Sequence, residues 1–126
     1  MNETSVLMVV EDDVHIRSII RDILEYEGYR VNEASNGAEA LTALTTDKPD
    51  LILLDLQMPV MSGWTFMQAL QKARTDVPVI IMSAQMNSVE RARQLGAVDC
   101  LSKPFELVAL LDIVAKYAGS SQDKRV

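Results

Sequence analysis

The sequence has little positive charge, a single cysteine and few aromatic residues. It contains 12 Lys and Arg residues against 18 Asp and Glu residues, and its formal net charge at pH 7 is −6. Surfaces that bind nucleic acids or anionic lipids carry clustered Lys and Arg, so we expect no direct contact with nucleic acid. A lone cysteine, Cys100, excludes a disulfide within the chain.

Long apolar runs and a leader segment are also lacking. The run from Val77 to Met82 is short and contains a proline, whereas a membrane-spanning helix needs about 20 apolar residues. The N-terminus has no basic segment followed by an apolar core, which a secretory signal requires. We therefore expect no membrane span and a cytoplasmic location. The length of 126 residues suits one hydrophobic core, which we assign to residues 1–118, with 119–126 as a polar tail or linker remnant.

Short apolar strands alternate with helical patterns along the chain. Val6 to Val10 is a nearly unbroken aliphatic run, typical of a strand buried on both faces. The predicted strands are 6–10, 29–34, 51–54, 77–82 and 98–101; the predicted helices are 13–28, 37–46, one from about 64, 87–95, and one after 104. This alternation predicts an α/β fold, a doubly wound five-stranded parallel sheet with helices on both faces.

Polar residues follow four of the predicted strands: Glu11, Asp12 and Asp13 after the first, Asp55 after the third, Ser83 after the fourth and Lys103 after the fifth. The carboxyl ends of parallel strands share one edge, where binding sites form. Carboxylates gathered there repel one another and need a cation, and oxygen ligands favour Mg²⁺. Asp55 is then placed to attack phosphorus, while Ser83 and Lys103 are suited to stabilise the transferred phosphoryl oxygens.

These residues belong to sequence blocks that resemble the signature motifs of receiver domains of two-component response regulators. The blocks are Val9–Asp13, Asp55–Pro59 with Ser62–Gly63, Ser83–Ala84, Gly96–Ala97 and Lys103–Phe105. They occur in order, at strand ends, and span nearly the whole chain. The resemblance implies a flavodoxin-like strand order of 2-1-3-4-5.

The resemblance also implies roles for individual residues. Asp55 would accept a phosphoryl group, and Lys103 would be aimed into the site by a cis peptide before Pro104. The cofactor would be Mg²⁺. Its direct ligands would be Asp12, Asp55 and the backbone carbonyl of Gln57, and Glu11 would assist mainly through water. In the family register Asp12 lies five residues before an arginine of the first helix, here Arg17, which identifies Glu11 and Asp12 as the acidic pair.

A receiver domain would act as a switch that catalyses only its own phosphorylation and dephosphorylation, rather than as an enzyme. A histidine kinase or histidine phosphotransfer protein would donate the phosphoryl group, and a downstream protein target would receive the signal. A homodimer through the fourth helix, fifth strand and fifth helix is left open by the sequence.

One position departs from the family pattern. Three residues before the lysine the family commonly has Tyr or Phe, whose rotamer couples to the Ser or Thr hydroxyl, whereas this chain has Cys100. A phosphorylation-independent interaction module therefore remains an alternative. A phosphoaspartate-type phosphatase is disfavoured because Gln57 replaces the second acid that it needs, and a flavin carrier because carboxylates replace a phosphate-binding loop.

Three residues near the predicted site also have plainer interpretations. Asp13 is equally compatible with capping the first helix. His15, the only histidine, fits a surface position on the first turn of that helix. Cys100 fits a small buried apolar residue better than a redox sensor.

Overall fold

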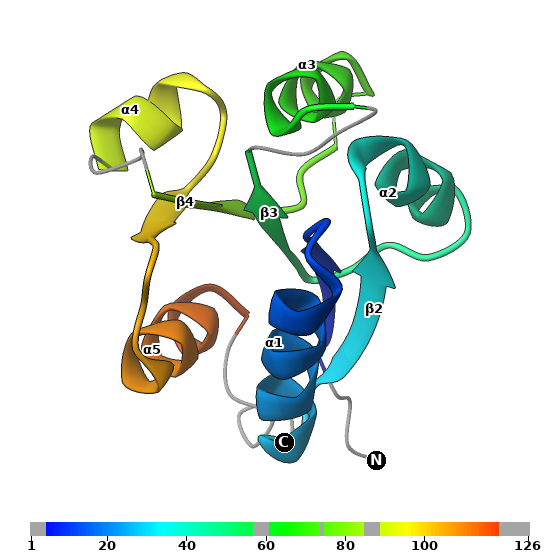
Figure 1. The fold of residues 1–126 in the computed structure, drawn as a ribbon. Helices are drawn as coiled ribbons and strands as arrows, with labels where there is room; N and C mark the ends of the chain where they lie inside the picture. Colours follow the sequence, from blue (N-terminus) through cyan, green and yellow to red (C-terminus); the bar gives the residue numbers. More distant parts are fainter. Residues whose placement is uncertain (1–4, 57–60, 74, 85–88, 119–126) are drawn as a thin grey trace.

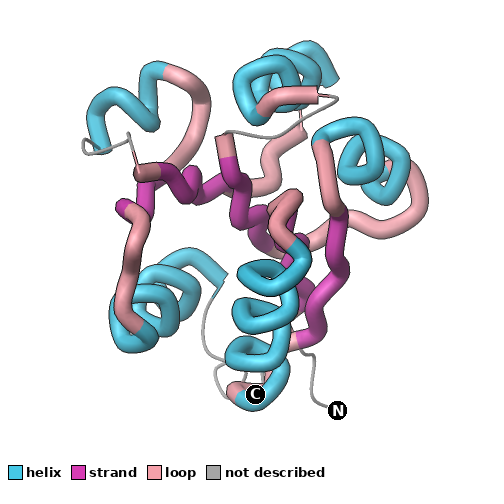
Figure 2. Tube along the Cα trace, in the orientation of Figure 1, coloured by secondary structure: helices cyan, strands magenta, loops and turns pink. Residues whose placement is uncertain are grey.

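The structure, a computed structural model, describes residues 5–56, 61–73, 75–84 and 89–118. Strands and helices alternate along this part of the chain (Figures 1 and 2). The elements are β1 Val6–Val10, α1 Val14–Tyr26, β2 Arg30–Ala34, α2 Gly37–Leu44, β3 Leu51–Asp55, α3 Gly63–Ala73, β4 Val79–Ser83, α4 Val89–Gln94, β5 Asp99–Ser102 and α5 Leu107–Ala118. None of the described helices is long and apolar enough to cross a membrane.

The five strands form one parallel sheet in the order β2-β1-β3-β4-β5. Every residue of β3 and β4 is buried, because helices cover both faces of the sheet. The prediction of a doubly wound sheet with strand order 2-1-3-4-5 is therefore confirmed. The order reverses between β1 and β3, and in such sheets sites form beyond the carboxyl ends of the strands at this place.

Two hydrophobic cores lie on opposite faces of the sheet. One face packs against α2, α3 and α4, with Phe66 as its largest fully buried side chain. The other face packs against α1 and α5 through Ile20, Leu24, Leu110 and Val114. Figure 1 shows the same division, with α1 and α5 on one side of the sheet and the remaining helices on the other. Successive residues of each buried strand point their side chains alternately into the two cores.

Several predicted boundaries differ from the observed ones by one or two residues. Strand β4 begins at Val79 rather than Val77, because Pro78 has no amide hydrogen to donate to a neighbouring strand. At its other end the strand includes Ser83. Helix α2 ends at Leu44 rather than at residue 46. The hydroxyl groups of Thr45 and Thr46 instead donate to the preceding turn's carbonyls, which competes with a further helical turn. Residues 87–88 of the predicted fourth helix and the predicted tail lie outside the described residues.

Candidate functional site

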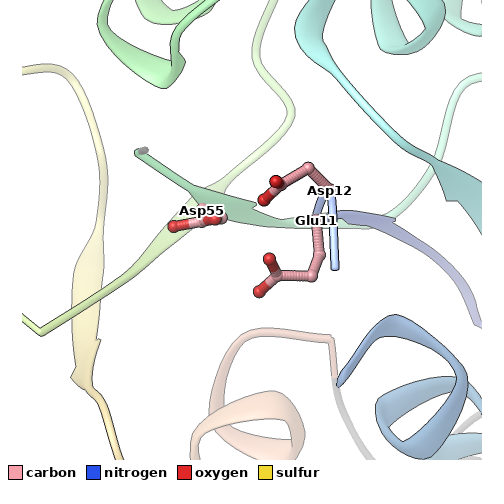
Figure 3. Close-up of side chains that lie close together, drawn as sticks. All are labelled: Glu11, Asp12 and Asp55. Carbon is pink, nitrogen blue, oxygen red and sulfur yellow. The ribbon is translucent and has the colours of Figure 1, made fainter. Parts of the chain in front are cut away.

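Three carboxylates from two neighbouring strands meet at the carboxyl edge of the sheet. Glu11 and Asp12 directly follow β1, and Asp55 is the last residue of β3. One oxygen of each carboxylate lies within 4.8 Å of the others, and Figure 3 shows the side chains of Glu11 and Asp12 extending beside Asp55. Glu11 and Asp55 are buried, whereas Asp12 is exposed. The sequence prediction that the strand ends bring these acids together is thus matched by the geometry.

Lys103 brings positive charge to the carboxylates. Its Nζ donates a hydrogen bond to Oε1 of Glu11 at 2.6 Å and lies 3.6 Å from Oδ1 of Asp55. The Lys103 amide donates to the carbonyl oxygen of Ser83 at 3.1 Å, which ties the segment after β5 to the end of β4. The Lys103–Pro104 peptide is cis, as the sequence resemblance implied.

Burial and like charge shape the protonation of Glu11. Burial raises the pKa of Glu11 to about 7, and the negative charge of Asp55 adds to the increase, while the hydrogen bond from Lys103 opposes it. The pKa of Lys103 is raised: burial acts to lower it, but the hydrogen bond and the charges of the two carboxylates outweigh that effect. The site therefore concentrates more negative charge than one ammonium group balances.

The acidic cluster has the donor chemistry of a site for a hard divalent cation. Its three carboxylates offer oxygen ligands that lie close enough together for one ion to contact all of them, and Mg²⁺ is commonly held by one or two carboxylates with water completing the shell. A cation would also relieve the repulsion between Glu11 and Asp55. The residues therefore fit Mg²⁺. Gln57, the predicted carbonyl ligand, lies outside the described residues.

Asp13 and His15 adopt their plainer roles. The Asp13 carboxylate accepts hydrogen bonds from the backbone amides of His15 and Ile16 at 2.9 and 3.1 Å, and so caps the N-terminus of α1. These hydrogen bonds, that from Ile16 foremost, lower the pKa of Asp13. His15 is exposed on the first turn of the same helix. Neither residue belongs to the carboxylate cluster.

Ser83 and Cys100 lie on adjacent strands near the cluster. Ser83 is the buried last residue of β4, one register step beyond the pairing of Asp55 with Met82. Cys100 pairs with Ile81 in the sheet and is half-buried against the core formed with α2, α3 and α4. Burial, together with the charge of Asp99, raises the pKa of the Cys100 thiol. The sulfur therefore remains a thiol at neutral pH and packs as a small apolar group.

Two neighbouring features were not predicted from the sequence. Arg17 donates a hydrogen bond to the backbone carbonyl of Glu11 and pairs with Glu33 of β2. Beside Lys103, an apolar groove of about 430 Å³ runs between α1 and the start of α5. Its lining residues are Ile16, Ile19, Ile20, Ile23, Ala84, Lys103, Pro104, Phe105, Leu107 and Leu110. The isoleucine stripe of α1 signalled a core-facing helix, but Ile19 is 58% exposed, so the stripe extends beyond the core.

The comparison with known sequences agrees with this geometry. The sequence profile of the response regulator receiver domain matches residues 7–115, which extend from the second residue of β1 into α5. The chain belongs to the receiver domain family of response regulators. Sporulation initiation phosphotransferase F of Bacillus subtilis is 34% identical over 119 residues, covering 93% of this chain and 94% of that protein.

Other relatives of this receiver domain are longer proteins. The response regulator MprA of Mycolicibacterium vanbaalenii is 37% identical over 107 residues, which cover 83% of this chain and 46% of MprA. The chain thus spans about half the length of that relative. Among solved structures, the receiver domain of Francisella response regulator 1452 is 30% identical with a TM-score of 0.85, covering 91% of this chain and 97% of that one. The chemotaxis protein CheY4 of Vibrio cholerae is 28% identical with a TM-score of 0.82, covering 91% and 99%.

Proposed function

We propose that this receiver domain is a phosphorylatable switch in which Asp55 accepts a phosphoryl group from a phosphohistidine, with Mg²⁺ as cofactor. The observation that supports this most strongly is the position of Asp55. It ends a buried strand, lies within 4.8 Å of two other carboxylates and has an ammonium nitrogen 3.6 Å away. The relative from Bacillus subtilis is named a phosphotransferase, which agrees with this chemistry.

In the proposed reaction, an Oδ atom of Asp55 attacks phosphorus as the bond from phosphorus to the donor's imidazole nitrogen breaks. The bonding electron pair stays on that nitrogen, and Asp55 becomes an acyl phosphate. Bound Mg²⁺, held by Glu11, Asp12 and Asp55, would offset charge on the phosphoryl oxygens. Lys103 would turn from Glu11 toward the same oxygens, and the Ser83 hydroxyl would donate a hydrogen bond to one of them. Water would later attack the phosphorus atom, which breaks its bond to Asp55, releases inorganic phosphate and restores the carboxylate.

The apolar groove beside the site supports a docking role for the phosphohistidine donor. Lys103 and Ala84 line it beside the site, while exposed Ile19 and Leu107 extend it along α1 and α5. A donor that presents its histidine to Asp55 must cover this adjoining surface. We therefore propose that the donor is a histidine kinase or histidine phosphotransfer protein that packs apolar side chains into the groove.

We propose that phosphorylation alters the surface formed by α4, β5 and α5, which then binds a downstream protein target or a second copy of the domain. Cys100 replaces the family's aromatic residue at the predicted site of coupling, so the movement of Ser83 and the segment after β4 would carry the signal. The domain would modify only itself, in the cytoplasm. A phosphorylation-independent module would show identical amide spectra around residues 83–103 before and after phosphorylation.

Transfer from a protein donor tests the proposal. A histidine phosphotransfer protein carrying ³²P on its histidine is mixed with the wild type and with Asp55→Asn, with Mg²⁺ or with EDTA. We expect label to pass to the wild type in Mg²⁺ only, and never to Asp55→Asn. Equal labelling of the variant would overturn the assignment of Asp55, and equal labelling in EDTA would overturn the role of Mg²⁺.

A further inference from the structure

The guanidinium group of Arg17 links the β1–α1 segment to strand β2. Its Nη1 donates to the backbone carbonyl of Glu11 at 2.8 Å, and its Nε donates to Oε1 of Glu33 at 3.1 Å. The Arg17 side chain is only 16% exposed. Hydrogen bonds from a charged donor in a partly buried place are stronger than neutral ones, so this link holds its two partners in a defined arrangement.

The Glu11 carbonyl belongs to the peptide group that joins Glu11 to Asp12. The amide of Glu11 donates to the carbonyl of Ala34 in β2 at 3.1 Å, so both backbone polar groups of Glu11 are held. A peptide group is planar, and fixing its carbonyl therefore also fixes the direction in which the backbone continues to Asp12. The Asp12 side chain is exposed, so its direction depends mainly on this backbone.

The rest of the segment is held by different contacts. Asp13 caps α1, and its amide donates to Oε2 of Glu11 at 3.3 Å. Asp12 thus lies between a residue fixed by β2 and Arg17 and a residue fixed by the helix. The fixed side at Glu11 depends on the Arg17 side chain, whereas the side at Asp13 depends on the cap of α1 and on the Glu11 carboxylate.

Arg21 provides a natural comparison on the same helix. It is one helical turn beyond Arg17, and its Nη1 donates to Oε2 of Glu33 at 3.0 Å. Its other hydrogen bonds go to Asp22, the adjacent residue. Arg17 and Arg21 therefore share Glu33 as a partner, but the contact with the Glu11 carbonyl belongs to Arg17.

We infer that Arg17 is a positioning residue for the cation site: its hydrogen bond to the Glu11 carbonyl, braced by Glu33, directs the Asp12 carboxylate toward Asp55. Arg17 itself touches neither the cation nor the phosphoryl group. The inference rests on the proposed function, because it assumes that Glu11, Asp12 and Asp55 bind Mg²⁺. Residues that orient metal ligands in this way typically change metal affinity by about 10–100-fold when they are replaced.

The test compares Arg17→Met with Arg21→Met, since methionine keeps much of the apolar stem and removes the charge and donors. Calorimetric titration with MgCl₂ at constant ionic strength measures affinity, and thermal unfolding in EDTA measures stability without metal. Amide NMR spectra of the metal-free proteins report the conformation at Asp12. We expect Arg17→Met to bind Mg²⁺ at least about 10-fold more weakly and to shift the Asp12 amide signal, and Arg21→Met to stay within about two-fold of the wild type.

Phosphorylation by acetyl phosphate adds an independent readout. If Arg17 acts through Asp12, the rate for Arg17→Met should return to the wild-type rate at saturating Mg²⁺, because Asp55, Ser83 and Lys103 are unchanged. Should Arg17→Met fail to fold, Arg17→Lys is titrated instead. Lysine supplies one ammonium for two acceptors, and we expect a weakening of about three-fold or more.

Unchanged affinity in the Arg17 variant, or equal weakening in Arg21→Met, would overturn the inference. The wild-type titration separates this from failure of the proposed function. Absence of Mg²⁺ binding to the wild type would overturn the cation site itself, whereas binding that is equal in wild type and Arg17→Met would overturn only the role of Arg17.

Discussion

Between pH 5 and pH 8, the buried carboxyl group of Glu11 should make the metal-free protein less stable as the pH rises. Its pKa is about 7 in the folded protein and 4.5 as the ordinary value. From pH 4.5 to 7 the folded state thus binds a proton that the unfolded state has released. Folding is favoured most below pH 4.5, and this advantage is lost as the pH approaches 7 and levels off above it.

The size of the effect follows from the same shift in pKa. A rise of this size corresponds to about 3 kcal/mol in the free energy of unfolding. Because Glu11 is 1% exposed, solvent screening should reduce the effect little. Among the residues that the structure describes, the other carboxyl groups with shifted pKa values have lowered ones; they are Asp13, Glu39 and Asp76. Their contributions to stability therefore change below this pH window.

Urea unfolding in EDTA, followed by circular dichroism at intervals from pH 5 to pH 8, measures the effect. Glu11→Gln is the matched control, since it keeps the shape and a hydrogen-bond acceptor for Lys103 but does not titrate. We expect the free energy of unfolding of the wild type to fall by about 2–3 kcal/mol relative to the variant over this range, since part of the full effect lies below pH 5. Parallel profiles for the two proteins would refute the reasoning.

Three further predictions concern single side chains. Lys103→Ala should slow phosphorylation by acetyl phosphate by about 10²–10³-fold, since it removes charge stabilisation of the phosphoryl oxygens. A rate near the wild type would contradict that role. Lys72→Ala, at an exposed position near the end of α3, serves as the control. Gly63→Ala should lower the free energy of unfolding by about 2 kcal/mol or more, because the new Cβ would lie 2.6 Å from the Leu56 Cα. Gly37→Ala should cost clearly less in the same urea assay, as the Cβ there meets the flexible side chain of Met61; equal losses would count against this explanation. Ile19→Ser should slow phosphoryl transfer from a phosphohistidine protein by about five-fold or more while leaving the rate with acetyl phosphate unchanged. Glu25→Ser, outside the groove lining, is the control. A slower rate with both donors would argue against a docking role for Ile19.

The carboxylate cluster was predictable because each member is fixed by a local pattern. Fully apolar runs identified β1 and β3, and parallel strands place the residues at their ends on one edge of the sheet. The sequence does not rank the partners of Lys103, whose nitrogen is 2.6 Å from Glu11 and 3.6 Å from Asp55. That choice depends on side-chain reach across the sheet, which sequence spacing does not report.

The contacts of Arg17 and the apolar groove could not be read from local patterns. Arg17 and Glu33 are 16 residues apart, and their pairing depends on the register that places Glu33 beside Val9. The isoleucine stripe of α1 fits a helix that packs on a core, but periodicity gives the direction of an apolar face and not its width. Asp13 was undecided for a related reason, since an acid that opens a helix has the same sequence pattern whether it caps the helix or binds a cation.

Phosphorylation of Asp55 is tested most directly by the mass of the intact protein. Wild type, Asp55→Asn and Asp13→Asn are incubated with acetyl phosphate and Mg²⁺, weighed, and mapped by tandem mass spectrometry of peptides. Asp13→Asn keeps a capping side chain at a nearby position and should behave as the wild type does. We predict that the wild type and Asp13→Asn each gain one phosphoryl group, located on Asp55, and that Asp55→Asn gains none. A wild type that gains no phosphoryl group, or gains it at another residue, would contradict the proposed function.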